Sequence, residues 1–147
     1  MRTIMPVMNR IGFFIIVLAL SPNAGAATAE VVAVVSAKNP VTALSKNQIV
    51  DIFLGKVSRF PDGGQAVPID QAEGSAARDE FYTKFSGKSP AQLKAHWSKI
   101  IFTGRGQPPR EVSNGIEVKK FIARNPDAIG YIESDLVDDS VKVLLTQ

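Results

Sequence analysis

The sequence predicts an α/β domain in which helices flank a small, mixed sheet. Residues 31–35 form an apolar run rich in valine, as in a strand that is covered on both faces. Three further short segments have the apolar pattern of strands. Between these segments, apolar residues recur at helical spacing after clear capping residues. Strands and helices that share one chain of this length indicate a single α/β core.

The first residues have the pattern of a secretory signal peptide. A positively charged start precedes the uncharged apolar run of residues 11–20, and small residues at 24–26 suit a signal peptidase. We expect cleavage after Ala26, so that residues 1–26 are a signal peptide and residues 27–147 form one periplasmic domain. An uncleaved anchor is the alternative, but the apolar run is shorter than the ~20 residues of a membrane span.

Composition narrows the classes of function. The chain has no Cys, which excludes disulfides, a lipoprotein anchor and thiol chemistry. Its single His, His96, lies mid-helix beside Trp97, and we expect it at the edge of the core rather than in a metal site or as a general base. Removing Arg2 and Arg10 from 17 basic residues leaves 15 against 14 acidic ones, a net charge of +1. We therefore expect no metal, no cofactor and no nucleic acid partner.

The first helix has the clearest start in the chain. Ser45 and Gln48 form a capping box, and Gly55 follows as the helix end. Residues 67–69 are then expected to form a short strand, in which Pro68 favours an edge or a strand-end position.

Three more helices are expected, each after a polar capping residue. They begin after Ser75, Ser89 and Asn114 and end near Gly87, Gly104 and Asn125. Residues 104–110 are expected to form an irregular loop, and residues 129–132 and 141–145 the last two strands. The side chains expected to pack over the sheet are Ile49, Ile52, Phe53, Phe81, Phe85, Trp97, Ile101, Phe121 and Ile122.

The turn that precedes the second helix is the expected functional site. Gly74 permits a bend, Ser75 caps the helix, and the first N–H groups of a helix lack intrahelical acceptors and attract anions. Arg78 opposes the helix dipole in the first turn, which is easier to explain if an anion or a carboxylate lies nearby. The alternative is an ordinary capped helix whose Arg78 pairs with Glu73 or Asp79.

Catalytic patterns are weaker. Ser75 lies on a strand-to-helix turn, as in a nucleophile elbow, but Ala77 stands where that motif requires Gly. The acidic pair Asp138-Asp139 is typical of a solvated end rather than a catalytic dyad. The residues therefore favour a binding protein over an enzyme.

Several short motifs occur in a familiar order along the chain. They are Asn39-Pro40-Val41, Leu44-Ser45, Ile52-Phe53-Leu54-Gly55-Lys56, Asp62-Gly63, Glu73-Gly74-Ser75, Arg78, Phe81 and Ile129-Gly130-Tyr131. With these motifs the chain resembles the phosphate-binding protein family of ABC transporters, whose two lobes close on phosphate. The resemblance implies a single lobe of a type II periplasmic-binding-protein-like fold, without the second lobe.

The family's anion loop, Arg-x-x-Gly-Ser-Gly-Thr, aligns with residues 71–77. The first position is Gln71 in place of Arg, and Ala76 and Ala77 replace Gly and Thr. These changes remove a forked cation and a hydroxyl donor, so the resemblance implies weakened phosphate recognition. The ligand-binding residues that the resemblance and the helix start together predict are Gln71, Gly74, Ser75, Ala76, Ala77 and Arg78.

The expected function is that of an exported periplasmic solute-binding-like protein for phosphate or a similar oxyanion, linked to ABC-type phosphate uptake. Its expected partners are the anion and an ABC permease, another envelope protein or a second copy of the chain. The alternative is a single-lobe interaction or sensing module in the cell envelope with a decayed anion site. We also expect Gln71→Arg to tighten phosphate binding, because it restores a forked, charged donor beside Gly74.

Overall fold

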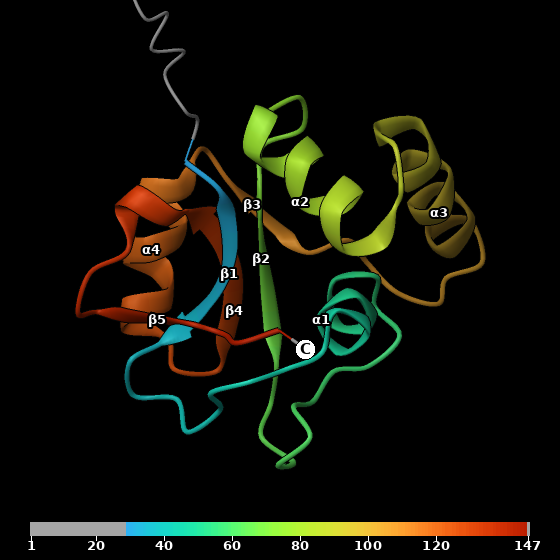
Figure 1. Cartoon of the computed structure of the whole chain (residues 1–147). Coiled ribbons are helices and arrows are strands. Elements are labelled where there is room, and N and C mark those ends of the chain that lie inside the picture. The colour runs from blue at the N-terminus through green and yellow to red at the C-terminus, as the bar shows by residue number, and fades with distance from the viewer. Residues whose placement is uncertain (1–28, 147) are drawn as a thin grey trace, which may run out of the picture.

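The computed structural model describes residues 29–146, and the expected signal peptide of residues 1–26 lies outside them. No helix in the described range is both long and apolar enough to cross a bilayer. Along the chain the elements are β1 (Val31–Ser36), α1 (Lys46–Phe53), β2 (Val67–Gln71), α2 (Ala76–Ser86), α3 (Pro90–Phe102), β3 (Arg110–Val112), α4 (Gly115–Arg124), β4 (Ala128–Glu133), the 3₁₀ helix η1 (Ser134–Leu136) and β5 (Val141–Val143) (Figure 1).

The five strands form one mixed sheet in the order β3-β2-β4-β1-β5. Strand β2 runs parallel to β3 and β4, whereas β1 runs antiparallel to β4 and β5. Strand β1 is interior and buried on both faces, as the apolar run predicts, although β4 holds the middle place. Strand β2 is also interior, and Pro68 lies near its start, where the pairing with β3 has not yet begun. Its missing N–H therefore costs little at this position.

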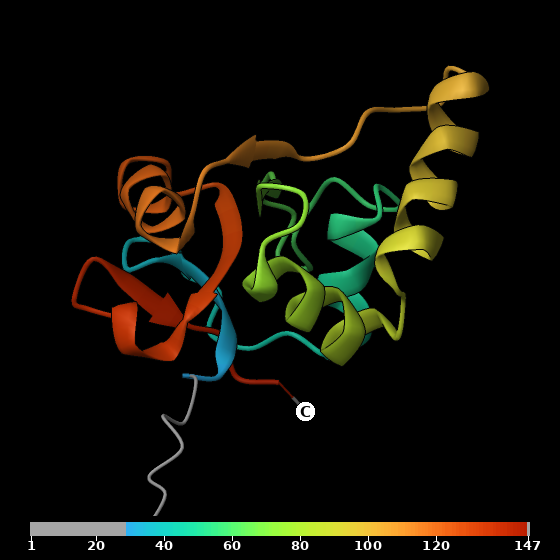
Figure 2. The same ribbon diagram turned by 90° about the horizontal axis from the view of Figure 1, so that it is seen from above.

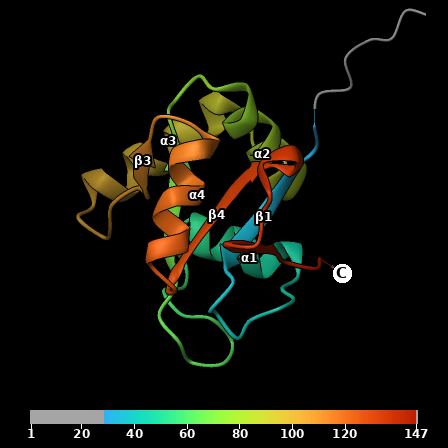
Figure 3. The ribbon, with the colours of Figure 1, turned by 90° about the vertical axis from the view of Figure 1, so that its left-hand side faces the viewer.

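Helices cover both faces of the sheet. Helix α4 packs on one face, and α1 and α2 pack on the other, with α3 farther out beyond them (Figures 1 and 3). On the α4 side the approach is close because β4 carries Gly130. A Cβ at this position would lie 2.6 Å from Val118 Cγ1 and 2.7 Å from Ile122 Cδ1.

The capping residues define the helix starts as the sequence predicts. Ser45, Ser75, Ser89 and Asn114 are the N-caps, and each side chain accepts a hydrogen bond from the backbone N–H three residues later. Helix α2 ends at Gly87, whose φ of 69° is a left-handed conformation that glycine adopts without strain.

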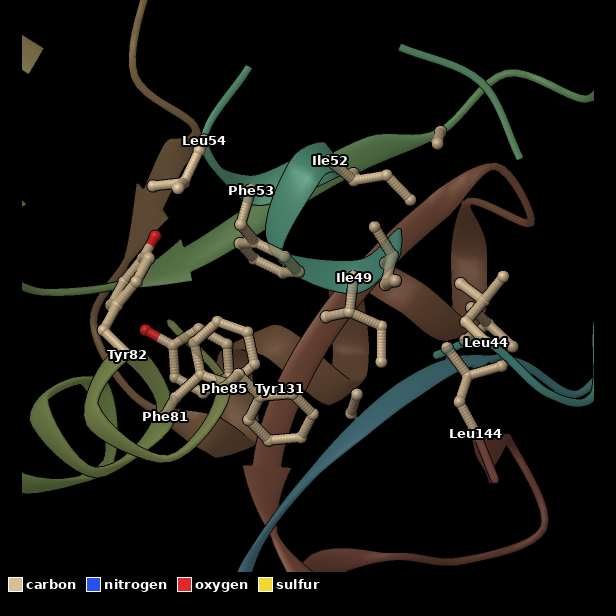
Figure 4. Packing of buried hydrophobic residues seen from close by; sticks show 14 of the residues in the cluster. Leu44, Ile49, Ile52, Phe53, Leu54, Phe81, Tyr82, Phe85, Tyr131 and Leu144 are labelled. Carbon is tan, nitrogen blue, oxygen red and sulfur yellow. The ribbon is translucent and has the colours of Figure 1, made fainter. Parts of the chain in front are cut away.

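The larger core lies between the sheet and α1 and α2, and aromatic rings form its centre (Figure 4). Tyr131 of β4 stacks on Phe81 of α2 with ring centroids 4.0 Å apart, and Phe53 of α1 meets Phe81 edge-on at 4.8 Å. Tyr82 also contacts this cluster through its ring edge. These contacts fix α2 on the sheet and place its N-terminus at the end of β2.

Three expectations about the core and strands need correction. Ile101 is 56% exposed, because α3 contacts the core through Leu93 and Trp97 and turns the side of Ile101 away. Phe121 is only half-buried, at the margin of the α4 core. The expected loop of residues 104–110 ends in a strand, β3, which pairs with β2 through its backbone and carries no apolar run that would reveal it.

Candidate functional site

The candidate site lies where β2 ends and α2 begins. Strand β2 ends at Gln71, and a short turn with Gly74 at a φ of 87° leads to the N-cap Ser75. Because β2, β3 and β4 are parallel, their carboxyl ends meet at this edge of the sheet, where open α/β folds commonly bind ligands. The elements thus bring a strand end and a helix N-terminus together.

A buried carboxylate, Asp70, organises this edge. Asp70 is 2% exposed and accepts hydrogen bonds from Tyr82 Oη to Oδ2 at 2.6 Å, from Tyr131 Oη to Oδ1, and from the Gln71 N–H to Oδ1 at 2.9 Å. Arg78 Nη1 lies 3.8 Å from Oδ2. A buried charge persists only when it is paired and hydrogen-bonded, and this network meets both conditions.

The Asp70 carboxylate remains costly to bury. Burial raises its pKa above the ordinary value near 3.8, and this effect exceeds the opposing hydrogen bonds from Tyr131 and Tyr82 and the attraction of Arg78. The same burial, together with the charge of Asp70, raises the pKa of both tyrosines. At neutral pH the two hydroxyls therefore stay protonated and act as donors.

A pH dependence of stability follows from Asp70. The folded state holds its proton more tightly than the unfolded chain does, so its contribution to stability is greatest below pH 3.8 and falls as pH rises through the native-state pKa. We expect the unfolding free energy of wild type minus that of Asp70→Asn to fall as pH rises from 4 to 7 in urea titrations. Asp139→Asn, at an exposed position, is the control. A difference that is constant or rises with pH would contradict the assignment.

Arg78 is held by internal partners. Its Nη1 donates to Gln71 O at 3.0 Å and forms an ion pair with Glu111 of β3, in addition to its approach to Asp70. The partners of Arg78 are therefore Asp70 and Glu111, not Glu73 or Asp79 as the alternative interpretation of the sequence has it. Of the two carboxylates, only that of Glu111 is well exposed, at 47%.

The helix N-terminus offers free donors. Ser75 Oγ accepts from the Arg78 N–H at 3.2 Å, which leaves its own hydroxyl proton available. Within residues 29–146, the N–H groups of Ala76 and Ala77 have no acceptor. Ala76 is exposed and Ala77 is buried. The two N–H groups are the orphan donors that every helix start leaves.

Gln71 lies inside the protein rather than beside the turn. Its side chain is 1% exposed, and Nε2 donates to Tyr131 O at 3.0 Å. Its backbone carbonyl accepts from Arg78, so Gln71 contacts the candidate site through the main chain.

The surface near α2 has two hollows, and the residues predicted to bind the anion line one or the other of them. A pocket of about 200 Å³ between α2 and α3 is lined by Arg78 together with Tyr82, Trp97 and Glu111. A second hollow, of about 320 Å³, is lined by Ala76 and Ala77 with the acidic residues Glu80, Glu133 and Asp135. The structure thus brings Arg78 and Ser75 together through the backbone, but it places the Arg78 guanidinium and the two Ala residues in different hollows.

Among the solved structures that share this fold is a protein of Clostridium perfringens with bound phosphate, assigned as a phosphate ABC transporter substrate-binding protein. It is 26% identical, with a TM-score of 0.62. An ABC-type phosphate transport receptor of Vibrio cholerae is 21% identical (TM-score 0.62), and PstS of Borrelia burgdorferi is 14% identical (0.59). The chain has the fold of phosphate ABC transporter substrate-binding proteins, as the sequence motifs predict.

The match is to part of those proteins. The superpositions cover 79 to 81% of this chain but only 44 to 47% of the three solved chains, which fits a single lobe. No protein family model matches the chain. The solved neighbours are binding proteins rather than enzymes.

Sequence reasoning missed four residues of this edge: Asp70, Tyr82, Glu111 and Tyr131. Asp70 and Glu111 come together with Arg78 only through the parallel pairing of β2 with β3. An acid at the end of an apolar strand, just before the Gly74 turn, was the available signal for Asp70. Nothing in the local sequence indicates Glu111.

Proposed function

We propose that this chain is a solute-binding-like lobe that binds phosphate or a similar small oxyanion where β2 ends and α2 begins. The proposal includes export to the periplasm, a link to ABC-type phosphate uptake and the absence of catalysis. One observation carries it: Arg78 and the unpaired N–H groups of Ala76 and Ala77 lie at this edge in a fold shared with a protein solved with phosphate. A helix N-terminus and a guanidinium are the donors that oxyanions prefer.

In this proposal, the anion accepts from the hydroxyl of Ser75 and from the N–H groups of Ala76 and Ala77, while Arg78 supplies the opposing charge. Because the Arg78 guanidinium lines the other hollow in the unbound structure, the proposal requires this side chain to turn toward the helix N-terminus when the anion binds. Because Glu111 already pairs with Arg78, phosphate has to compete with this carboxylate. Repulsion between two anions that share one guanidinium weakens the complex, so we expect modest affinity.

Calorimetry tests the proposal. We expect heat of binding when the purified chain is titrated with phosphate, sulfate or arsenate at millimolar concentration, and its loss in Arg78→Ala. Arg124→Ala, which removes an exposed arginine at the end of α4, should bind like wild type. Absence of heat for all three anions in the folded wild-type chain would remove this function.

A second test looks for a gain of affinity. It is needed because Arg78→Ala also leaves the buried Asp70 without its cation, so this variant can lose binding by losing its fold. Glu111 is exposed on an edge strand, so Glu111→Gln should keep the fold and release Arg78. We expect it to tighten phosphate binding by about fivefold, the equivalent of ~1 kcal/mol for removal of one nearby like charge at a surface. Glu117→Gln is the matched control on α4. Unchanged affinity in Glu111→Gln would mean that the anion does not contact Arg78.

A second candidate function is a single-lobe interaction or sensing module. It is favoured by the carboxylates of Asp70 and Glu111, which already pair with Arg78 within the chain. Such a module could act with a permease, another envelope protein or a second copy. Light scattering with and without phosphate separates the two: association that is independent of phosphate, in a chain that binds no anion, would favour the module.

A further inference from the structure

Helix α3 presents an apolar and basic surface to solvent. Phe102 at its end is 92% exposed, and Ile101 beside it is more than half exposed. Since successive helical residues are turned by about 100°, Phe102 points opposite the buried stripe of Leu93 and Trp97. The same geometry places Lys94 and Lys99 on either side of Phe102.

The segment that carries this surface is basic, although Glu73, Asp79 and Glu111 line the hollow that Lys94 and Ile101 border on the α2 side. From Phe81 to Arg110 the chain has six basic residues and no acidic one. Four of them are exposed, and three of these, Lys94, Lys99 and Arg105, lie on α3 or just after it. None of the three forms an ion pair with another residue of the described range. We call the surface made by Lys94, Lys99, Ile101, Phe102 and Arg105 the α3 tip.

The position of α3 makes the tip accessible. Seen from above, α3 stands at the outer side of the molecule, and its C-terminal end projects past the other helices (Figure 2). Only Leu93 and Trp97 are fully buried among its side chains. No described element covers Phe102, so its ring faces solvent on a helix that also carries Lys94 and Lys99.

We infer that the α3 tip docks on an anionic lipid bilayer, with Phe102 and Ile101 entering the interface and the three cations contacting headgroup phosphates. The charge complementarity of the tip selects this occupant, since basic residues that flank exposed aromatic and aliphatic side chains are the pattern of peripheral membrane attachment. A second copy docked through the same surface would place like charges against one another. A bilayer also requires no groove, and Phe102 at the end of α3 is 92% exposed.

An environment-sensitive label tests the docking. Because the chain has no Cys, Thr103→Cys gives one attachment site beside Phe102, and Ser134→Cys gives one near the start of β1. On vesicles of phosphatidylcholine with one quarter phosphatidylglycerol, we expect emission from position 103 to shift to the blue. The shift should be absent with phosphatidylcholine alone and should be reversed at high salt. The label reports on the tip itself, whereas vesicle binding of the whole chain does not. The apolar run of residues 11–20 is expected to bind bilayers without any contribution from the tip.

Variants show which side chains are responsible. Phe102→Ser should abolish the shift at position 103, whereas Ile116→Ser, which removes a half-exposed residue of α4, should leave it unchanged. The double variant Lys94→Gln, Lys99→Gln should bind vesicles at least about tenfold more weakly, as measured by the label at position 103. A shift at position 134 without one at 103 would overturn the inference. A blue shift at position 103 without vesicles would also overturn the inference. If it appeared at higher concentration of the chain, or on addition of an acidic protein, the tip would bind a protein rather than a bilayer.

Discussion

Replacing Tyr131 with Ala should lower the free energy of unfolding by about 3–5 kcal/mol, the usual loss for truncating a large buried ring. Tyr131 is fully buried, stacks on Phe81 and donates to Asp70 through its hydroxyl. The variant therefore loses the centre of the aromatic core and a donor to a buried carboxylate at once. Urea unfolding followed by circular dichroism measures the effect.

Tyr131→Phe separates the two contributions. It keeps the ring stack but leaves Asp70 Oδ1 with the Gln71 N–H as its remaining donor, and we expect a loss of about 1–3 kcal/mol. Asp70→Asn combined with Tyr131→Phe should cost less than the sum of the single changes, since the unpaired charge is then absent. Equal stabilities of Tyr131→Phe and wild type would mean that the hydroxyl does not stabilise Asp70.

Trp97→Ala should have a loss of similar size, about 3–5 kcal/mol, because Trp97 joins α3 to the rest of the domain. Trp97 is 6% exposed, and its ring packs beside Gly55, where a Cβ would lie 3.1 Å from Cη2. Within the described residues its Nε1 has no acceptor, so Trp97→Phe sacrifices no hydrogen bond and should cost clearly less.

Hydrogen exchange shows where the Trp97→Ala loss falls. We expect the amides of α3 to lose protection first, since Leu93, the partly buried Ile100 and the contact of His96 with Leu54 O are then left to hold the helix. Ser98→Ala, on the exposed side of α3, is the control. An unchanged denaturation midpoint in Trp97→Ala would contradict the placement of this helix face.

Local signals determined which elements could be predicted. The capping residues Ser45, Ser75 and Ser89 act on N–H groups only three residues away, so the sequence reveals the helix starts directly. Strand β3 was not predicted because it has only three residues, two of them exposed, and it joins the sheet through backbone pairing with β2. The burial of Ile101 was overestimated because periodicity identifies an apolar side of a helix but not how much of it another element covers.

The candidate site was predicted only in its local part. The turn at Gly74, the cap at Ser75 and the position of Arg78 in the first turn are properties of consecutive residues. The carboxylates that hold Arg78 depend on tertiary pairing: Glu111 is 33 positions away along the chain. Side chains of neighbouring residues on a strand point to opposite faces, and no local pattern indicates which face the Gln71 side chain takes.

This last point changes the expectation for Gln71→Arg. The Gln71 side chain is buried and bonded to Tyr131 O, so an Arg there has to place its guanidinium within the Asp70 network or displace it. A change in phosphate affinity in Gln71→Arg could therefore not be separated from a change in the packing of the core. Glu111→Gln is the cleaner way to raise the positive charge that an anion meets.

The most direct test of the proposed anion site is a phosphate titration followed by the backbone amide signals of the ¹⁵N-labelled chain. We expect saturable shifts that are largest for Ser75, Ala76, Ala77 and Arg78. At equal occupancy the shifts of these four amides should be smaller in Glu111→Gln, because phosphate then does not have to break the ion pair between Arg78 and Glu111. Sulfate should compete for the same signals. Shifts centred instead on Lys94, Lys99 and Arg105, or no saturable shift at millimolar phosphate, would contradict an oxyanion site at the start of α2.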